Sequence, residues 1–297
     1  MVLQHAALRD TVCLEVRGAD AAPFLQAQLT RSVADLDPAS APLAAWADPR
    51  GRLRALVRVC PLPDRWLLIT PRDGADELLK RLRVFVLRAK VTLARADDVH
   101  VAALLGSADD WLVARGVAAA DVAPNRLVRR GDVTLIRVGP AYWQVLGTSS
   151  AAHAFATELG AAAEATEAEL AEIALGIPAI TLTLADRFVA QMLNLDALDA
   201  VSFDKGCYPG QEVIARVHNL GGVKRRARRY AAPAEPPTVG TPVLAAAREV
   251  GEVVRSAPAR TGCELLAIVE HAAVGSPLTC AGAPLAELPL PFEVPRD

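Results

Sequence analysis

The N-terminal third of the sequence alternates strand-like and helix-like apolar patterns in an order that few folds accommodate. Strand-like segments place apolar side chains at every second residue, whereas helix-like segments repeat them every three or four residues. The order is strand, helix, strand, strand, helix and strand, at residues 12–16, 20–36, 53–59, 66–70, 73–86 and 91–93. This order is typical of a split βαβ, or ferredoxin-like, unit. We therefore expect residues 1–95 to form one α+β unit.

A second, weaker succession of the same kind follows. Its strand and helix patterns lie at residues 99–105, 109–115, 133–138, 142–146 and 151–159. They predict a second α+β unit over about residues 96–165, which residues 166–229 would close.

The pattern changes once more from residue 230 onward. Residues 231–237 are rich in alanine and proline, and the short apolar segments after them alternate with glycine and proline turns. We expect a small all-β barrel at residues 230–297. The predicted fold class is α+β, with a body at residues 1–229 followed by this barrel.

The overall charge of the chain is close to zero, with 32 lysines and arginines against 34 aspartates and glutamates. No global field draws such a chain to nucleic acid, so any anion site must be local. Arg52, Arg54 and Arg58 alternate along one predicted strand, and residues 224–229 form the densest basic run. Both sets are most simply solvated faces, but arginine forks at either place could bind carboxylates or phosphates.

The five cysteines are widely spaced and include no Cys-x-x-Cys pair, which argues against a disulfide framework, a zinc knuckle or a cluster held by four thiolates of one chain. The five histidines are also scattered, so no metal site is indicated. Reduced thiols fit a cytoplasmic protein. The sequence has no signal-peptide pattern at its start and no apolar run near the roughly 18 residues of a membrane span.

One of these cysteines lies in a loop that is built to present a side chain. Cys207 stands between Gly206 and Tyr208, two residues after Lys205, and a Pro-Gly turn precedes a short helical segment. A nearby cation and a helix N-terminus both favour a thiolate. Cys207 is therefore the candidate reactive residue, although a free cysteine can also be a small buried apolar residue.

The string Lys-Gly-Cys-Tyr-x-Gly-Gln-Glu at residues 205–212, followed by Val-Ile-Ala-Arg, resembles the signature of the YgfZ family. Members of this family are folate-binding relatives of the glycine-cleavage T-protein that support iron–sulfur proteins. The resemblance extends over roughly residues 12–230. Other family-like segments lie at residues 18–30, 49–52, 85–91, 188–198 and 224–225.

The resemblance implies a T-protein-like body of two ferredoxin-like units with the C-terminal barrel. It also implies a folate-dependent accessory role in assembling or repairing iron–sulfur clusters, including those of tRNA-modifying enzymes. Cys207 would be the essential thiol, tuned by Lys205. The loop would be shaped by Gly206 and Gly210 and held against the body by Tyr208, Gln211 and Glu212. Tetrahydrofolate, or a one-carbon derivative of it, would be bound by Arg52, Gln191, Asn194, Lys224 and Arg225.

The expected partners are folate and iron–sulfur client or assembly proteins, with no direct nucleic acid contact, no membrane and a monomeric chain. The chain departs from the family at Ala174, where many members have a glutamate in a position to hold the pterin ring. A buried pterin would then need another acceptor, and Trp46, Tyr142 and Trp143 are the candidate stacking platforms.

Three alternative functions remain. A folate-dependent aminomethyl-type transferase is implied by the T-protein relationship, but residues 53–57 lack the carboxylate that assists folate chemistry there. A cysteine hydrolase with His218 as base lacks an orienting partner and an oxyanion motif. The third is a binding scaffold in which Cys207 is inert.

Overall fold

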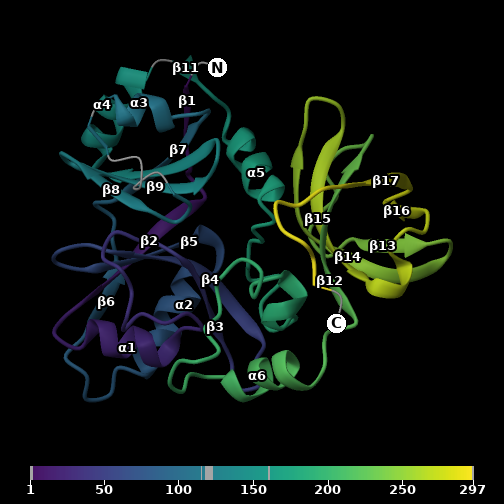
Figure 1. Ribbon diagram of the computed structural model, residues 1–297, viewed down its shortest axis with the longest axis horizontal. Coiled ribbons are helices and arrows are strands. Elements are labelled where there is room, and N and C mark those ends of the chain that lie inside the picture. The colour runs from purple at the N-terminus through teal and green to yellow at the C-terminus, as the bar shows by residue number, and fades with distance from the viewer. Residues whose placement is uncertain (1–2, 115, 118–122, 160, 296–297) are drawn as a thin grey trace. The chain divides into compact units, whose positions relative to one another are not determined.

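The computed structural model describes residues 3–114, 116–117, 123–159 and 161–295 (Figure 1). The chain forms two compact units. The N-terminal unit contains the described residues up to 168 except 29–31 and 45–56, which belong with residues 169–295 to the C-terminal unit. None of the described helices has the length and apolar character that crossing a membrane requires.

The first sheet has the predicted ferredoxin-like order. Its strands run in the order β3-β4-β5-β2-β6, and β2 lies antiparallel between β5 and β6. Helix α2 packs against β2, β5 and β6. The elements of this part are β2 (Thr11–Arg17), α1 (Ala21–Gln28), β3 (Leu43–Ala47), β4 (Leu53–Pro61), β5 (Trp66–Pro71), α2 (Arg72–Val84) and β6 (Thr92–Arg95).

The first helix and one strand of this part differ from the prediction. The first helix ends at Gln28 because the backbone N–H of Thr30 donates to Ala45 (2.9 Å) and its hydroxyl donates to the carbonyl of Ala200 (2.7 Å). Strand β3 was not predicted, since its five residues are all buried and show no alternation.

The second sheet has the order β11-β1-β7-β10-β9-β8, and the predicted hairpin at 133–138 and 142–146 is present as antiparallel β9 and β10. Strand β1 was not predicted and pairs with β7, although it precedes the first sheet in the sequence. The predicted helix at 109–115 ends at residue 113 in the structure, and residue 115 lies outside the described residues. The elements are β1 (Gln4–Ala7), β7 (His100–Leu105), α3 (Asp109–Val113), β8 (Leu127–Arg130), β9 (Val133–Gly139), β10 (Tyr142–Gly147), α4 (Ser149–Leu159) and β11 (Ala161–Ala162).

An apolar cluster joins side chains of both sheets within the N-terminal unit. Cys13 of β2 and Cys60 of β4 share it with Ile136 of β9 and Leu146 of β10. Both faces of β4 are therefore buried, and this overturns one prediction. Arg58 is only 4% exposed instead of solvated, donating to Ala41 O and Asn125 Oδ1, each at 2.7 Å.

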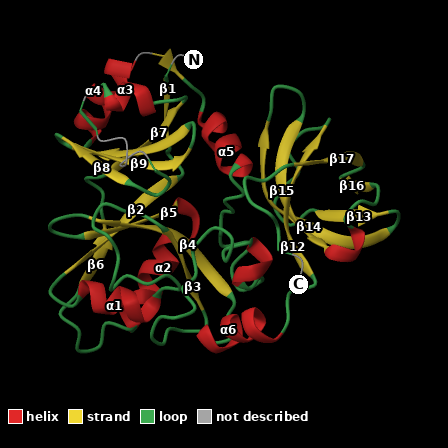
Figure 2. Ribbon diagram, viewed as in Figure 1, coloured by secondary structure: helices red, strands yellow, loops and turns green. Residues whose placement is uncertain are grey.

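In the C-terminal unit, a largely irregular segment precedes a closed barrel. Helix α5 (Ala165–Ala174) begins in the N-terminal unit, and a 3₁₀ turn at Ala190–Leu193 and helix α6 (Gln211–Leu220) follow (Figure 2). The barrel has the strand order β12-β15-β14-β13-β16-β17 and an interior of buried apolar residues, as predicted for the C-terminal part. Its strands are β12 (Arg225–Ala232), β13 (Pro242–Ala245), β14 (Arg248–Pro258), β15 (Cys263–Glu270), β16 (Leu278–Cys280) and β17 (Ala283–Leu288), with a 3₁₀ turn at His271–Ala273.

Candidate functional site

Cys207 lies on the loop that leads directly into α6, and it is exposed. The other four cysteines, Cys13, Cys60, Cys263 and Cys280, are buried. Burial raises the pKa of Cys13 and of Cys60 to about 12, and it also raises the pKa of the two barrel cysteines. Since the thiolate is the reactive form, Cys207 is the thiol that a partner or reagent in solution can use.

Lys205 fastens this loop to the body of the C-terminal unit. Its ammonium donates to the backbone oxygens of Leu29 (2.6 Å) and Arg31 (3.0 Å), and it lies 5.0 Å from the centre of the Tyr208 ring. The side chain is only 9% exposed, and burial lowers the pKa of Lys205 to about 8. Tuning of the thiol by Lys205 stays a prediction, and these contacts give the side chain a fastening role as well.

Two glycines interlock the end of the loop with the turn at residues 48–51. Gly210 has a φ of 81°, and a methyl group there would lie 2.5 Å from the backbone oxygen of Asp48 and 2.7 Å from Cα of Gly51. Gly51 has a φ of 73°, and a methyl group there would lie 3.0 Å from Cβ of Val213 in α6. Neither position accepts a side chain without movement, because both the backbone conformation and the close approach require glycine.

The remaining residues of the motif divide into buried and exposed ones. Gln211 donates to the backbone oxygen of Lys205 (3.0 Å), and Tyr208 is buried, which raises the pKa of its phenol to about 12. Glu212 does not hold the loop, contrary to the prediction, because its side chain is exposed and pairs with Arg216 one turn along α6 (2.7 Å). Gly206 is exposed, and a methyl group there would meet no atom within 4 Å.

His218, the base of the hydrolase alternative, stacks on the loop. Its ring lies parallel to the ring of Phe203, with centroids 3.7 Å apart and an interplanar angle of 12°. This contact gives His218 a packing role between α6 and the segment that precedes Lys205.

The two amides predicted to bind folate lie in the interior of the C-terminal unit. Asn194 is fully buried and donates to the backbone oxygen of Ala227 (2.8 Å), so it anchors the chain to β12. Gln191 is 2% exposed and donates to the backbone oxygen of Ile214 in α6 (2.8 Å). Its Oε1 atom has no hydrogen-bond partner among the described residues, and a buried acceptor of this kind requires a partner.

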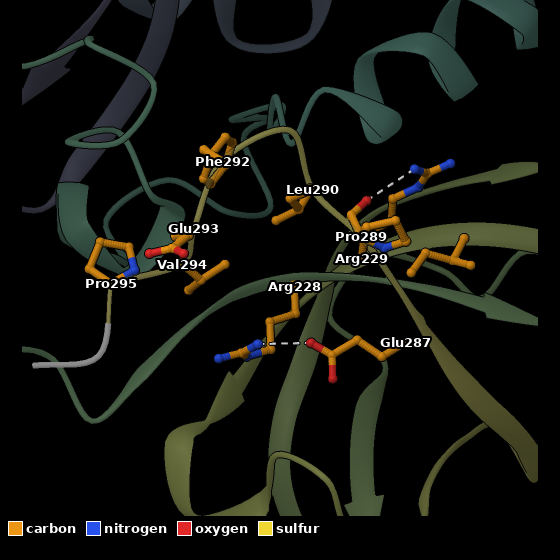
Figure 3. A pocket seen from close by; sticks show the side chains of 10 residues that line it. Arg228, Arg229, Glu287, Pro289, Leu290, Phe292, Glu293, Val294 and Pro295 are labelled. Atoms are coloured by element: carbon orange, nitrogen blue, oxygen red, sulfur yellow. Dashed lines mark hydrogen bonds and ion pairs between the residues drawn. The ribbon is translucent and has the colours of Figure 1, made fainter.

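The basic run at residues 224–229 is not a free anion site. Each of its four arginines forms an ion pair with a carboxylate of the same unit. The pairs are Arg225 with Glu252, Arg226 with Asp196, Arg228 with Glu287 and Arg229 with Glu264. Figure 3 shows Arg228 joined to Glu287 (2.8 Å) in the lining of a pocket of about 560 Å³, and Arg229 donating to the backbone oxygen of Pro289. The burial of Arg226 and Arg228 contradicts the solvated-face interpretation, whereas the predicted folate contact of Arg225 remains a proposal. Lys224 alone in the run is exposed without an ion pair among the described residues, so its predicted folate contact remains a proposal.

The arginines next to the 48–51 turn instead line an open pocket of about 580 Å³. Its lining residues are Asp48, Pro49, Arg50, Arg52, Arg54 and Asp186. Arg54 pairs with Asp186 (2.6 Å), and Arg52 donates to the backbone oxygen of Arg187 (2.8 Å). Arg50 is exposed, and its side chain has no ion pair with any described residue. The pocket therefore has one uncommitted cation and two arginines that are already held in place.

The predicted stacking platforms are not accessible. Trp46, Tyr142 and Trp143 are 3%, 2% and 0% exposed. Trp143 belongs to an apolar cluster of the N-terminal unit, and the guanidinium of Arg54 lies 5.7 Å from the centre of the Trp46 ring. Their rings pack in the two units, which corrects the prediction.

Arg50 and Asp186 line the pocket although no site role was predicted for either residue. Arg50 belongs to the recognisable Asp-Pro-Arg-Gly turn, whose Asp48 carboxylate accepts the backbone N–H groups of Arg50 and Arg52 (both 2.9 Å). Asp186 had no local signal, because it reaches Arg54 from 132 residues away. Among the described residues, no three histidine, cysteine, aspartate or glutamate side chains gather as a metal site.

Comparisons with known proteins identify relatives of this chain. The chain is 30% identical over 239 residues to the tRNA-modifying protein YgfZ of Sodalis glossinidius, an alignment that spans 78% of this chain and 73% of that protein. It is 29% identical over 217 residues to the protein of the same name from Colwellia psychrerythraea, across 71% of this chain and 66% of that one. No family model matches the sequence.

A solved structure shows the fold. The crystal structure of the glycine cleavage system aminomethyltransferase T from Bartonella henselae matches 99% of this chain and 87% of its own, with a TM-score of 0.75 and 16% identity. The two chains therefore share a T-protein-like fold.

Proposed function

Because the chain belongs to the YgfZ family, we propose that it is a folate-binding accessory protein for the assembly or repair of iron–sulfur clusters. Its clients would include tRNA-modifying radical enzymes, and it would act in a reducing, cytoplasmic compartment where its thiols stay free. The observation that carries this proposal is the exposed Cys207 on a loop fastened by Lys205, Gln211 and Gly210.

A fastened loop suits a thiol that must meet a cluster on another protein. A thiolate is the cysteine form that binds iron, and the iron or cluster is here the cargo and not a resident cofactor. Because the backbone around Cys207 is already held, less conformational entropy is lost when a client binds it.

The residues fit a folate in two places. The arginine pocket beside the 48–51 turn suits the glutamate carboxylates, since Arg50 is uncommitted and Arg52 and Arg54 are held. The N–H donors of a pterin ring need a buried acceptor. Gln191 Oε1 is a buried acceptor without a partner among the described residues, so it would take the place of the glutamate that is absent at Ala174. A bound reduced folate would supply its capacity to carry one-carbon groups.

Complementation of a deletion strain tests the role of the thiol. Wild type should restore cluster occupancy and activity of a radical tRNA-methylthiolating enzyme, whereas Cys207→Ser should not, because a hydroxyl is a poor iron ligand of similar shape. Asn219→Ala, an exposed change on α6, is the matched control and should behave as wild type. Full rescue by Cys207→Ser would remove the thiol from the mechanism.

Calorimetry with mono- and polyglutamyl tetrahydrofolate tests the ligand. We expect the polyglutamyl form to bind more tightly, with a preference that falls with salt and disappears in Arg50→Ala. Arg260→Ala, an exposed change in the barrel, is the control. Equal affinity of wild type for both forms, insensitive to salt, would contradict the assignment of the pocket.

A folate-dependent aminomethyl-type transferase is the alternative that the T-protein-like fold supports. The carboxylates near the strand at 53–57 are Asp186, 2.6 Å from Arg54, and Asp48, 4.0 Å from it, so both face a guanidinium. The strand itself offers no general base, because residues 53–57 contain no carboxylate. Robust folate-dependent ammonia release from a lipoyl-aminomethyl substrate would favour the transferase, and absence of both activities would leave a scaffold.

A further inference from the structure

The turn after α2 holds a leucine in solvent in an unfavourable conformation. Helix α2 ends at Val84, two residues earlier than predicted, and the backbone N–H of Ala89 then closes a turn onto Val86 O (2.8 Å). Leu87 stands in this turn with a φ of 44° and is 88% exposed. Glycine and asparagine adopt this left-handed conformation readily, whereas a branched side chain destabilises it.

Leu87 is part of an apolar cluster on the surface. Val84 is 66% exposed and Phe85 is 42% exposed, so three large apolar side chains protrude within four residues. They are half of the six exposed large apolar side chains in the described part of the chain. Single exposed apolar residues are ordinary, but a contiguous group marks a contact surface.

Cations surround this group. Residues 80–90 contain no acidic residue. They contain five exposed cationic side chains, namely Lys80, Arg81, Arg83, Arg88 and Lys90. Arg81 pairs with Glu77 (2.5 Å), and Arg83 donates to the backbone oxygen of Leu93 (2.7 Å). The side chains of Lys80, Arg88 and Lys90 have no ion pair with any described residue. Asp20, the other carboxylate nearby, accepts the backbone N–H of Lys90 (2.7 Å).

We propose that residues 80–90 form a docking surface for a partner protein that presents apolar side chains between carboxylates. Arginine and phenylalanine are the residues enriched in protein interfaces, and here they occupy the middle of the segment while the lysines lie at its ends. The cations complement an acidic partner and the apolar side chains supply the buried contact.

Two other kinds of partner fit less well. Single-stranded nucleic acid is bound by stacking on aromatic rings, and two of the three protruding side chains are aliphatic. A bilayer surface is bound by the long apolar face of an amphipathic helix, whereas these side chains lie at a helix end and in a turn. The inference goes beyond the proposed function and stands independently of the folate and thiol proposals.

The probe is a fluorescent amphipathic peptide of glutamate and leucine, whose binding to the full chain is followed by anisotropy. Leu87→Gly should weaken binding by at least about tenfold, the loss expected for an apolar side chain of this size. The same change relieves the left-handed strain, so the melting temperature should stay the same or rise. Loss of binding with retained stability separates lost contact from misfolding.

Matched variants complete the binding experiment. Leu220→Gly removes another leucine, 82% exposed at the end of α6, and should leave peptide affinity unchanged. Arg88→Glu should weaken binding and reduce its salt dependence, whereas Arg260→Glu, an exposed change in the barrel, should do neither.

A lysine footprint locates the peptide on the surface. The chain has four lysines, of which Lys205 is buried, Lys80 and Lys90 flank the proposed surface, and Lys224 is exposed elsewhere. Bound peptide should slow acylation of Lys80 and Lys90 by an amine-reactive ester and leave Lys224 unaffected. Equal protection of all three exposed lysines would overturn the proposal.

Two further results would also overturn it. The first is peptide affinity that neither Leu87→Gly nor Arg88→Glu changes. The second is tighter, Leu87-dependent binding to vesicles of phosphatidylcholine and phosphatidylglycerol, or to transfer RNA, than to the peptide, since these would assign the surface to a membrane or to nucleic acid.

Discussion

At the scale of single residues, Lys205 and Cys207 have opposite environments although one residue separates them. Lys205 is turned into the body and bound to two backbone oxygens, while Cys207 is exposed. This division explains how a short motif can both hold a loop and present a thiol. Each half of it can be tested separately.

Native-state alkylation should modify Cys207 first. Its thiol is exposed, whereas the other four are buried and must wait for local opening, which should slow them by at least about a hundredfold. Mass spectrometry of the peptides after a brief pulse of iodoacetamide measures the rates. Comparable native-state rates for Cys263 or Cys280 would show that the barrel opens far more readily than its closed strand order suggests.

Lys205→Met should destabilise the folded chain by about 1.5–3 kcal/mol, because it leaves two backbone oxygens without their charged donor. The difference from wild type should depend on pH. Burial lowers the pKa of Lys205 to about 8 from 10.5, so between these values the unfolded chain holds a proton that the folded chain has lost.

The stability of wild type relative to Lys205→Met should therefore rise as the pH increases from about 8 to 10.5 and be constant below that window. Urea unfolding of both proteins across this range measures the effect. A difference that stays flat would mean that Lys205 keeps its normal pKa.

At the scale of elements, the contact between α6 and the 48–51 turn connects the thiol loop with the arginine pocket. Gly210 and Gly51 allow the two backbones to approach, and Asp48 and Arg50 of the same turn line the pocket. Cys207 precedes Gly210 by three residues, so their Cα atoms are at most about 11 Å apart. The Gly210–Gly51 contact therefore joins the loop to the turn that lines the pocket.

Gly210→Ala should disrupt the contact between the thiol loop and the 48–51 turn. The added methyl group would lie 2.5 Å from Asp48 O, and the left-handed φ adds strain, so we expect a loss of about 1–3 kcal/mol. Gly206→Ala is the matched control, since its methyl group meets no atom within 4 Å. The melting temperature and the folate affinity should both fall in Gly210→Ala and stay near the wild-type values in Gly206→Ala. An equal effect of the two changes would refute the interlock.

At the scale of the whole molecule, each compact unit has its own apolar core and its own pair of buried cysteines. Cys13 and Cys60 lie in a core cluster of the N-terminal unit, and Cys263 and Cys280 lie inside the barrel of the C-terminal unit. A chain with two cores need not unfold in a single step.

Pulse alkylation at increasing urea concentration should therefore expose the two cysteine pairs in separate transitions. Cys13 and Cys60 should become reactive together, and Cys263 and Cys280 should become reactive together at a different midpoint. Fluorescence of the intact chain provides a reference for global unfolding. One shared midpoint for all four thiols would show that the units unfold as one cooperative body.

Features that depend on neighbouring residues could be predicted from the amino-acid sequence. Periodicity predicted the ferredoxin-like order of the first sheet, the hairpin of the second and the barrel, because alternation and turn residues act locally. The motif at 205–212 predicted the family and directed attention to Cys207 for the same reason: its residues are consecutive. The exposure of Cys207 fits its predicted role as the reactive thiol.

Which charged side chains lack an ion-pair partner depends on contacts between distant parts of the chain. In the sequence, Arg226 and Arg58 look as solvated as Arg50 does. In the fold, Arg226 donates to Asp196 and Arg58 donates to Asn125, and both acceptors lie far away in the sequence. The same holds for Trp46, Tyr142 and Trp143, whose burial depends on packing between segments far apart in the chain. Pairing and burial are properties of what the fold brings together, and no local pattern encodes them.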